Sequence, residues 1–302
     1  MRLLGGEPRP IPAYNSNGLG LQEAPAVADE ALELVAEGFR AVKIRLGRPA
    51  PADDVAAVRA VRSALPDDVA LMADFNQALS SSAASRVCRR LDDEGLEWIE
   101  EPIRHDDYAG AARLRTQLRT PLQIGENFAG IHPMVAALAH GASDFVMPDL
   151  DRIGGVTGWT RAAALADASG VPMSSHLYPE VSAHLLAATP TAHWLEYVDW
   201  AAPLLTEPVQ VTAGAIAASE RPGAGLAWDE DPVAHHRIDS VAHAAVRAPG
   251  CRTEAARPYG SRTPGPGACR SGEPRGRVSA RDGEAGWSWM RQRRDRGRDA
   301  SA

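Results

Sequence analysis

Polar side chains recur along this chain of 302 residues, on or directly after short apolar runs. In chain order, the candidates for chemistry are Lys43, Arg45, Asp74, Asn76, Glu100, Glu126, Asp149, His176 and Glu196. From Asp74 onward, the acids and the histidine are separated by 20 to 27 residues, close to the length of one strand–helix unit. If the apolar runs are parallel strands of one closed sheet, these side chains meet at its carboxyl end, where barrel enzymes carry out their chemistry.

Three of the acids have the composition of a metal site. Asp74, Glu100 and Glu126 follow three successive apolar runs, and three carboxylates brought together repel one another unless a cation lies between them. Ligation by oxygen alone suits Mg²⁺ better than Zn²⁺, which usually takes nitrogen or sulfur. Each acid alone could instead pair with a loop arginine. The regular series favours a metal site.

His176 is a candidate base. A single histidine is more often a hydrogen-bonded core residue, but Asp149, expected on the neighbouring strand, could accept its second N–H. Such a dyad would fix the imidazole tautomer and raise its basicity. Glu196 could be a plain salt-bridge partner. If burial keeps it protonated, it could instead donate a hydrogen bond to a developing oxyanion.

Lys43 and Arg45 are two residues apart, so their side chains leave the same face of a strand. The pair could simply neutralise the local acids. For Arg45 the sequence leaves this interpretation and a functional role equally open.

The elements that must position these residues alternate between strands and helices along 11–199. The expected strands are 11–16, 41–46, 70–76, 98–101, 122–126, 145–149, 172–176 and 194–198. Helix-period segments lie at 26–38, 52–65, 83–95, 134–141 and 158–170, and several end in glycine. Eight strands with crossovers favour an α/β fold of the (β/α)8 TIM-type barrel class. An open doubly wound sheet is the alternative, but no GxGxxG opens a helix after the first strand.

The composition of 44% hydrophobic and 24% charged residues is that of a globular protein. No run approaches 18 apolar residues, so no membrane span is predicted, and the first residues lack an apolar signal core. The three cysteines, Cys88, Cys251 and Cys269, are too scattered for a disulfide frame or a zinc site. A cytoplasmic location is therefore expected.

The composition changes after residue 238. Residues 239–302 contain 13 Arg, 7 acids and no Leu, Ile or Phe, and the net charge of −7 leaves about −13 for residues 1–238. Such a segment buries too little apolar surface to offset the entropy of ordering it, so a disordered low-complexity tail is predicted. A basic arm that binds nucleic acid is a weak alternative, and nucleic acid is otherwise not an expected partner.

Several motifs resemble a known family. They are AVKIRLG (41–47), DFNQ (74–77), WIEEP (98–102), GEN (125–127), MPDLDRIGGVTGW (147–159), SSHLYPE (174–180) and SAHLLAATPTAHWLE (182–196). Over residues 1–238 the chain resembles the mandelate racemase type within the mandelate racemase and muconate-lactonizing branch of the enolase superfamily. The resemblance implies a Mg²⁺-dependent racemase or epimerase that removes the α-proton of a 2-hydroxy carboxylate through an enediolate. Sites of the enolase superfamily use a Lys or His base together with one or two Mg²⁺ ions.

The resemblance also implies roles for single residues. Asp74, Glu100 and Glu126 would bind Mg²⁺. His176 with Asp149 would be one base, and Glu196 the acid at the substrate carboxylate. Lys43 and Asn76 would contact substrate oxygens.

The second strand departs from the family pattern of Lys-x-Lys, because it reads Lys43-Ile44-Arg45. The second Lys would be the other base, but an arginine, with a pKa of about 12.5 or more, accepts a proton poorly. Two-base racemisation is therefore in doubt. The alternative is an acid-sugar dehydratase that uses His176 as its sole base, with Arg45 holding a carboxylate bidentately.

Family members also carry a cap domain ahead of the barrel, which selects the substrate. We expect residues 1–10 to be a remnant of the cap-to-barrel junction and residues 11–238 to be the barrel and its return segment. A truncated, non-catalytic fragment is the third interpretation. The expected partners are a small hydroxy-acid or sugar-acid substrate and, by analogy, further copies of the chain in a homo-oligomer.

Overall fold

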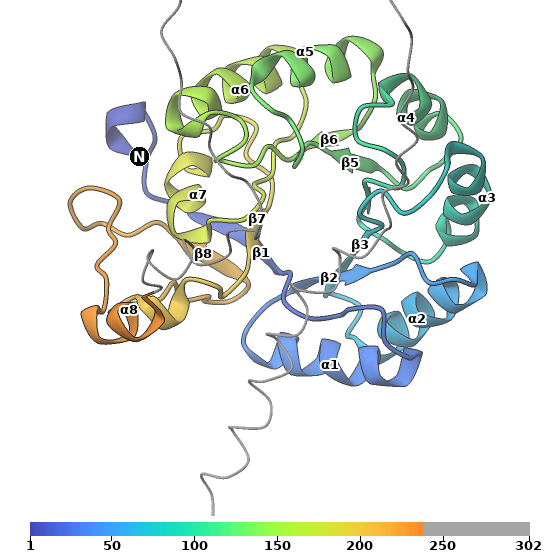
Figure 1. Ribbon diagram of the computed structural model, residues 1–302, viewed down its shortest axis with the longest axis horizontal. Helices are drawn as coiled ribbons and strands as arrows, with labels where there is room; N and C mark the ends of the chain where they lie inside the picture. Colours follow the sequence, from blue (N-terminus) through green and yellow to red (C-terminus); the bar gives the residue numbers. More distant parts are fainter. Residues whose placement is uncertain (238–302) are drawn as a thin grey trace, which may run out of the picture. The chain divides into compact units, whose positions relative to one another are not determined.

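The computed structural model describes residues 1–237, which form a (β/α)8 barrel as predicted. Parallel strands follow one another around the ring (Figure 1). They are β1 (Pro10–Asn15), β2 (Ala41–Arg45), β3 (Ala70–Asp74), β4 (Ile99–Glu100), β5 (Leu122–Ile124), β6 (Phe145–Val146) and β7 (Leu195–Tyr197), and β7 pairs with β1. The predicted disordered tail at 239–302 lies outside the described residues.

The seventh predicted strand, 172–176, forms isolated parallel bridges instead of a continuous ladder. Met173 bridges Val146 of β6 on one side and Ala192 on the other, and His176 bridges Asp149. Proline has no N–H to donate, and Pro148 and Pro172 contribute only their carbonyl groups to the hydrogen bonds here. The ring still closes through this segment, which lies between β6 and β7.

One strand was not predicted. β8 (Ala215–Ala217) runs antiparallel to the start of β1, with Ile11 opposite Ile216. Three residues between turns carry too short an alternating pattern to be recognised as a strand in the sequence.

Within residues 1–237, seven helices form the outer layer of the ring (Figure 1). They are α1 (Ala24–Ala36), α2 (Pro51–Ala64), α3 (Ser81–Leu91), α4 (Tyr108–Arg115), α5 (Ile131–His140), α6 (Gly155–Ser169) and α7 (Pro179–Leu186). Shorter pieces are the 3₁₀ turns η1 (Arg2–Leu4) and η2 (Ala202–Leu204) and the helix α8 (Glu230–His236). Proline in the first turn starts α1, α2 and α7, and Ser80 accepts a hydrogen bond from Ala83 at the start of α3. As predicted, α5 and α6 end at glycines in the left-handed region.

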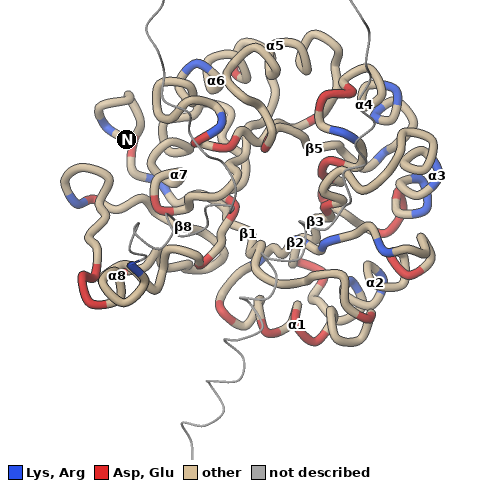
Figure 2. Tube along the Cα trace, viewed as in Figure 1, with Lys and Arg blue, Asp and Glu red and all other residues tan. Residues whose placement is uncertain are grey.

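Alternation along the strands separates two apolar layers. Val42 and Ile44 belong to the main core, while Ala41 lies in a second, smaller cluster with Tyr14, Met72 and Trp98. Because side chains alternate along a strand, Ala41 and Met72 share a face with Lys43 and Asp74. The smaller cluster therefore fills the barrel interior next to the charged residues. Figure 2 shows acidic segments on the inner side of the ring near β3. Among the described residues, no helix is long and apolar enough to cross a membrane.

Candidate active site

Asp74, Glu100 and Glu126 converge at the carboxyl ends of three adjacent strands. Asp74 and Glu100 are register partners that end β3 and β4, and Glu126 follows β5 by two residues. One carboxylate oxygen from each lies within 4.8 Å of those of the other two. Asp74 and Glu100 are buried, and Glu126 is half-buried.

This donor set fits a hard divalent cation. Six carboxylates gather here, and the arginines and lysine beside them in the described part of the chain are Lys43, Arg45 and, at 3.8 Å from Glu126, Arg152. The acids are Asp74, Glu100, Glu101, Glu126, Asp149 and Glu196. Burial, together with the charge of Asp74, raises the pKa of Glu100 well above its usual range. All-oxygen ligation and an excess of negative charge are the conditions that favour Mg²⁺.

Lys43 links the acids from inside the barrel. Its Nζ lies 2.9 Å from both oxygens of Glu100, 2.8 Å from Glu196 Oε1 and 3.3 Å from Asp74 Oδ2. The side chain is 1% exposed. Burial by itself would lower the pKa of Lys43, but Glu100, Glu196 and Asp74 outweigh it, so the pKa is raised. Lys43 is therefore a permanent cation, and its three N–H groups are shared among these acids.

Arg45 pairs with one of the candidate metal ligands. Its Nη1 lies 2.9 Å from Asp74 Oδ2, and its Nη2 donates to Ser16 Oγ at 3.0 Å. Burial opposes the charge, yet Asp74 and Glu196 raise the pKa of Arg45 further. Of the two roles that the sequence left open, the contact with a local acid is the one observed. Asn76 supports the same carboxylate, since its backbone N–H donates to Asp74 Oδ1 at 2.7 Å and its Nδ2 donates to Oδ2 at 3.2 Å.

His176 and Asp149 lie together across the bridge between their segments. The His176 Nδ1–Asp149 Oδ2 distance is 2.7 Å, and Asp149 Oδ1 accepts from the backbone N–H groups of Asp151 and Arg152. Burial would lower the pKa of His176, but Glu196, Asp149 and Glu126 together raise it. Burial likewise opposes the charge of Asp149, whose pKa is nevertheless lowered by the hydrogen bond from His176. An ionised Asp149 accepts a hydrogen bond from the Nδ1–H of His176, which leaves Nε2 as the nitrogen that can accept a proton.

The second ring nitrogen of His176 faces the other acids. His176 Nε2 lies 3.4 Å from Glu126 Oε2 and 3.9 Å from Glu196 Oε2. The base therefore adjoins the three-carboxylate cluster, although at least 50 residues of sequence separate it from each of the three acids. From the sequence alone, His176 and the three acids could be assigned to the same rim only by assuming a closed barrel.

Glu196 lies on β7, and the sequence left open whether it is a salt-bridge partner or, if burial keeps it protonated, a hydrogen-bond donor. Burial does favour the neutral acid, but Lys43, His176 and Arg45 outweigh it and hold the pKa of Glu196 below its usual range. The ionised carboxylate accepts from Lys43 through Oε1 and from the backbone N–H of Leu177 through Oε2 at 2.9 Å. Glu196 thus fixes both Lys43 and the turn that follows His176.

Glu101 was not among the predicted site residues. Alternation would point it away from Glu100, but its φ of 34° lies in the left-handed region and breaks that alternation. Glu101 is buried, and Asn127 Nδ2 donates to its Oε2 at 2.9 Å and to Glu126 Oε1 at 3.2 Å. Burial first, then the charge of Glu126, raises the pKa of Glu101 to about 8. The only sequence signal is the doubled acid in WIEEP.

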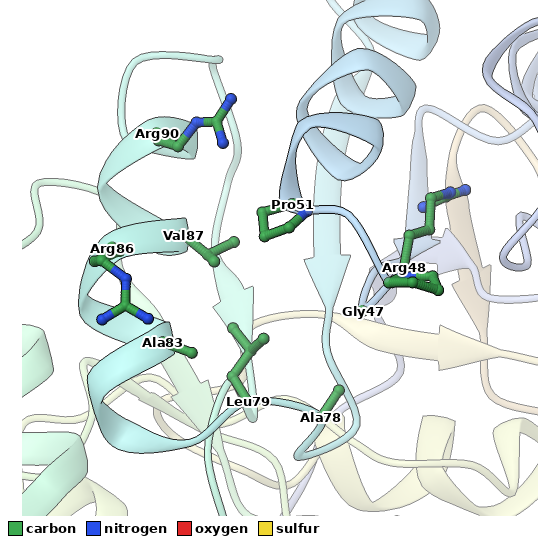
Figure 3. A pocket seen from close by; sticks show the side chains of 10 residues that line it. Gly47, Arg48, Pro51, Ala78, Leu79, Ala83, Arg86, Val87 and Arg90 are labelled. Carbon is green, nitrogen blue, oxygen red and sulfur yellow. The ribbon is translucent and has the colours of Figure 1, made fainter.

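A cavity of about 540 Å³ lies between α2 and α3 (Figure 3). Pro51, Leu79 and Val87 give it an apolar wall, and Arg86 and Arg90 of α3 lie on one side. None of the described residues that line it is a carboxylate or a histidine, so it is separate from the acid–base residues described above.

Comparisons with known proteins show what the chain resembles. Residues 26–232 match the family described as enolase C-terminal domain-like. The chain is 34% identical over 233 residues to L-talarate/galactarate dehydratase of Salmonella typhimurium, covering 76% of this chain and 58% of that protein. It is 35% identical over 232 residues to 3,6-anhydro-alpha-L-galactonate cycloisomerase of Streptomyces coelicolor, covering 76% and 63%. The chain therefore spans less than two thirds of the length of these relatives.

Two solved structures are also similar to this chain. An enolase from alpha proteobacterium BAL199 with bound magnesium superimposes with a TM-score of 0.76 at 53% identity, covering 78% of this chain and 66% of that one. An enolase from Bradyrhizobium, complexed with magnesium and mandelic acid, gives 0.74 at 45% identity, covering 79% and 65%.

Proposed function

This chain belongs to the enolase C-terminal domain-like family, and on that premise we propose that it uses Mg²⁺ and a single base, His176, to remove the α-proton of a 2-hydroxy carboxylate. One observation carries the proposal: His176 Nε2, with its partner Asp149 on the other nitrogen, lies 3.4 Å from Glu126 of the three-carboxylate cluster. A base and a cation site in contact are what α-proton abstraction needs, because the carbanion is stabilised only if its charge moves onto bound oxygens.

Asp74, Glu100 and Glu126 are the residues proposed to hold the ion. When bound, Mg²⁺ supplies a Lewis acid that neutralises the negative charge of the substrate carboxylate. Lys43 supports the same charge from inside the barrel, because it remains protonated among its three acids. Asn76 is exposed, and its amide is a further proposed contact for substrate oxygens.

His176 carries the proton. Its Nδ1 hydrogen is committed to Asp149, so Nε2 accepts the α-proton and becomes the acidic N–H of an imidazolium. The ionised Glu196 stabilises that cation from 3.9 Å and keeps the adjoining turn in place. Its proposed role is therefore that of an acceptor rather than an acid.

Arg45 favours dehydration of an acid sugar over racemisation. Its guanidinium is held by Asp74 and Ser16 and cannot accept a proton at working pH, so a second base is absent from that position. With one base, the C–H electrons expel the β-hydroxyl, His176 returns its proton to the departing oxygen as water leaves, and the enol product becomes a 2-keto acid. The similarity to L-talarate/galactarate dehydratase supports this outcome.

A racemase of the mandelate racemase type is the second candidate. It is favoured by the similarity to the Bradyrhizobium enolase complexed with mandelic acid, a compound that has no β-hydroxyl to lose. The two candidates differ in product: dehydration gives a keto acid that reacts with semicarbazide, and racemisation gives both enantiomers from one.

The variant His176→Asn tests the shared step. We expect loss of α-deuterium exchange from one enantiomer of a hydroxy acid, because asparagine accepts no proton, while Mg²⁺ affinity persists. Proton NMR in D₂O measures the exchange, and calorimetry measures the affinity. His140→Asn, on the exposed surface of α5, is the matched control and should exchange normally. Exchange at the wild-type rate in His176→Asn would rule out His176 as the base.

The variant Arg45→Lys tests the one-base interpretation. A lysine at this position can lose its proton, so we expect interconversion of enantiomers to rise relative to wild type. Chiral chromatography of a single starting enantiomer measures it. If no second enantiomer forms, position 45 is not a base site in this protein, and the dehydratase assignment does not depend on Arg45.

A further inference from the structure

The indole of Trp98 contacts a candidate metal ligand from the barrel interior. Trp98 is fully buried and precedes Glu100 by two residues, so both side chains face inward. Its Nε1 donates to Glu100 Oε2 at 3.3 Å. An indole N–H is a donor only, and a bond from it to a carboxylate is charge-assisted, so this contact selects one orientation of the carboxylate.

Neighbouring rings prevent the indole from turning away. Tyr14 stands edge-on to Trp98 at 5.4 Å and 80°, and Phe145 packs against it at 6.2 Å and 80°. His193 lies 5.9 Å from the same ring. The indole is therefore fixed on several sides, and its N–H direction is set by packing rather than by the carboxylate.

Tyr14 supports the other partner of the same ion pair. The face of its ring lies 5.4 Å from Lys43 Nζ, within the range of a cation–π contact. Its hydroxyl has no hydrogen-bond partner among the described residues. The favourable contact of Tyr14 with the charged residues is therefore made by its ring. Its buried hydroxyl lacks a hydrogen bond, which is unfavourable.

We infer that Trp98 is a positioning residue for metal binding: its N–H fixes the Glu100 carboxylate in the orientation that faces Asp74 and Glu126. The inference rests on the proposed function, in which these three acids hold Mg²⁺. Lys43 alone does not fix the orientation, because it contacts both oxygens of Glu100 at the same distance of 2.9 Å. Trp98 contacts only Oε2 and so distinguishes the two oxygens.

Two matched variants of the full chain test the inference. Trp98→Phe and Tyr14→Phe each remove one buried polar group and keep an aromatic ring in the same cluster. Groups that orient metal ligands typically change metal affinity by 10- to 100-fold when removed. We expect Trp98→Phe to weaken Mg²⁺ binding by about 10-fold or more. Tyr14→Phe should leave the affinity within about twofold of wild type, because its hydroxyl has no partner to lose. Isothermal titration calorimetry with MgCl₂ measures both.

Separate outcomes distinguish the possible failures. If wild type binds no Mg²⁺, the proposed function fails. If wild type binds Mg²⁺ and Trp98→Phe binds it equally well, the positioning role of Trp98 is overturned while the proposed function stands. Equal losses of affinity in Trp98→Phe and Tyr14→Phe would also overturn it, since they would reflect loosening of the cluster. The thermal midpoint without metal reports that loosening independently.

Trp98→His keeps the inference testable if Trp98→Phe does not fold. The neutral imidazole is smaller than indole but restores an N–H donor. Above pH 8, we expect Trp98→His to bind Mg²⁺ more tightly than Trp98→Phe, or than Trp98→Leu where Phe is not tolerated. An affinity no better than that of the variant without a donor would contradict the role assigned to the indole N–H.

Discussion

At the scale of single residues, the site is defined by an excess of acids over fixed cations. Lys43 touches three carboxylates, and Arg45 touches one of the same three. Neither cation reaches Glu126 in a direct ion pair among the described residues, and the contact that Glu126 makes with Arg152 is 3.8 Å long. The metal-free protein therefore carries more negative than positive charge around Glu100 and Glu126, and a divalent cation would reduce the resulting repulsion.

The variant Glu100→Gln should separate metal binding from stability. The amide has nearly the same shape and removes one of the repelling charges, so the free energy of unfolding without metal should be unchanged or higher. Wild type should gain about 2.7 kcal/mol at a free Mg²⁺ concentration 100 times its Kd, and the variant should gain nothing. Urea unfolding with and without Mg²⁺ measures both effects.

Glu94→Gln, which breaks the surface pair with Arg59, is the control and should keep the full gain from Mg²⁺. A marked loss of metal-free stability in Glu100→Gln would mean that the pair with Lys43 outweighs the repulsion among the acids.

His193 gives the free energy of unfolding a separate dependence on pH. Burial lowers its pKa from 6.5 to about 4, so the folded protein resists protonation that the unfolded chain accepts. Between pH 4 and about 6.5 the unfolded state binds more protons, so stability rises with pH across this window and is constant above it. We expect His193→Phe, which suits the aromatic neighbours, to lack this component, worth on the order of 1–3 kcal/mol. Urea unfolding from pH 4 to 8 measures the difference; parallel profiles for the two proteins would refute it.

At the scale of elements, the functional side chains lie at or just after the ends of short strands. Unfavourable backbone angles in the following turns change the directions of these side chains. β4 has two residues and β5 three, so Glu126 already lies in the turn after its strand. Positive φ angles occur at Asn76, two residues after β3, at Glu101, directly after β4, and at Leu177, directly after the bridged residue His176. Such backbone angles are unfavourable for residues with a side chain and are found where the surrounding structure holds them, often at functional sites.

Gly125 illustrates how a turn fixes a ligand. Its φ is 138°, and a Cβ there would lie 2.8 Å from the backbone N of Met147 and 3.0 Å from the Phe128 ring. Gly125→Ala should therefore displace Glu126 and weaken Mg²⁺ binding, as measured by calorimetry.

Gly130→Ala is the matched control, because Gly130 also has a positive φ of 77° but has no atom within 4 Å of a Cβ. It should lose stability through backbone strain and keep its Mg²⁺ affinity. Similar affinities in the two variants would show that Gly125 does not position Glu126.

Strands and residue spacing were readily predicted, whereas contacts that depend on local backbone angles were not. The apolar runs at 41–46 and 70–76 mark β2 and β3 well, because their alternating pattern is long enough to read. α4 and α7 were not among the helical segments named from the sequence, because each has only eight residues and shows little periodic pattern. Glu101 was missed because its inward turn comes from a positive φ. For Glu196 the sequence left a salt-bridge partner and a protonated acid both open, because its contact with Lys43 comes from closure of the ring.

At the scale of the whole described region, closure of the barrel brings together site residues that are up to 153 positions apart in sequence, Lys43 and Glu196. All residues of the proposed site lie within 1–237. Ending the chain after Asp239, the boundary of the first compact unit, should therefore leave the Mg²⁺ affinity within about twofold of the full chain. Calorimetry on the two proteins side by side measures it. A larger loss would show that residues 240–302 contribute to metal binding.

The pairing of β1 has a consequence for synthesis of the protein. β1 is made before the other described strands, yet its neighbours include β7 and β8, whose last residues are Tyr197 and Ala217. Tyr14, which contacts Trp98 and Lys43, also lies on β1. On the ribosome, the nascent chain must therefore keep β1 exposed along one edge until some 200 further residues have emerged. An unpaired edge of this kind is open to aggregation, so chaperone demand during translation should fall sharply once Ala217 leaves the exit tunnel.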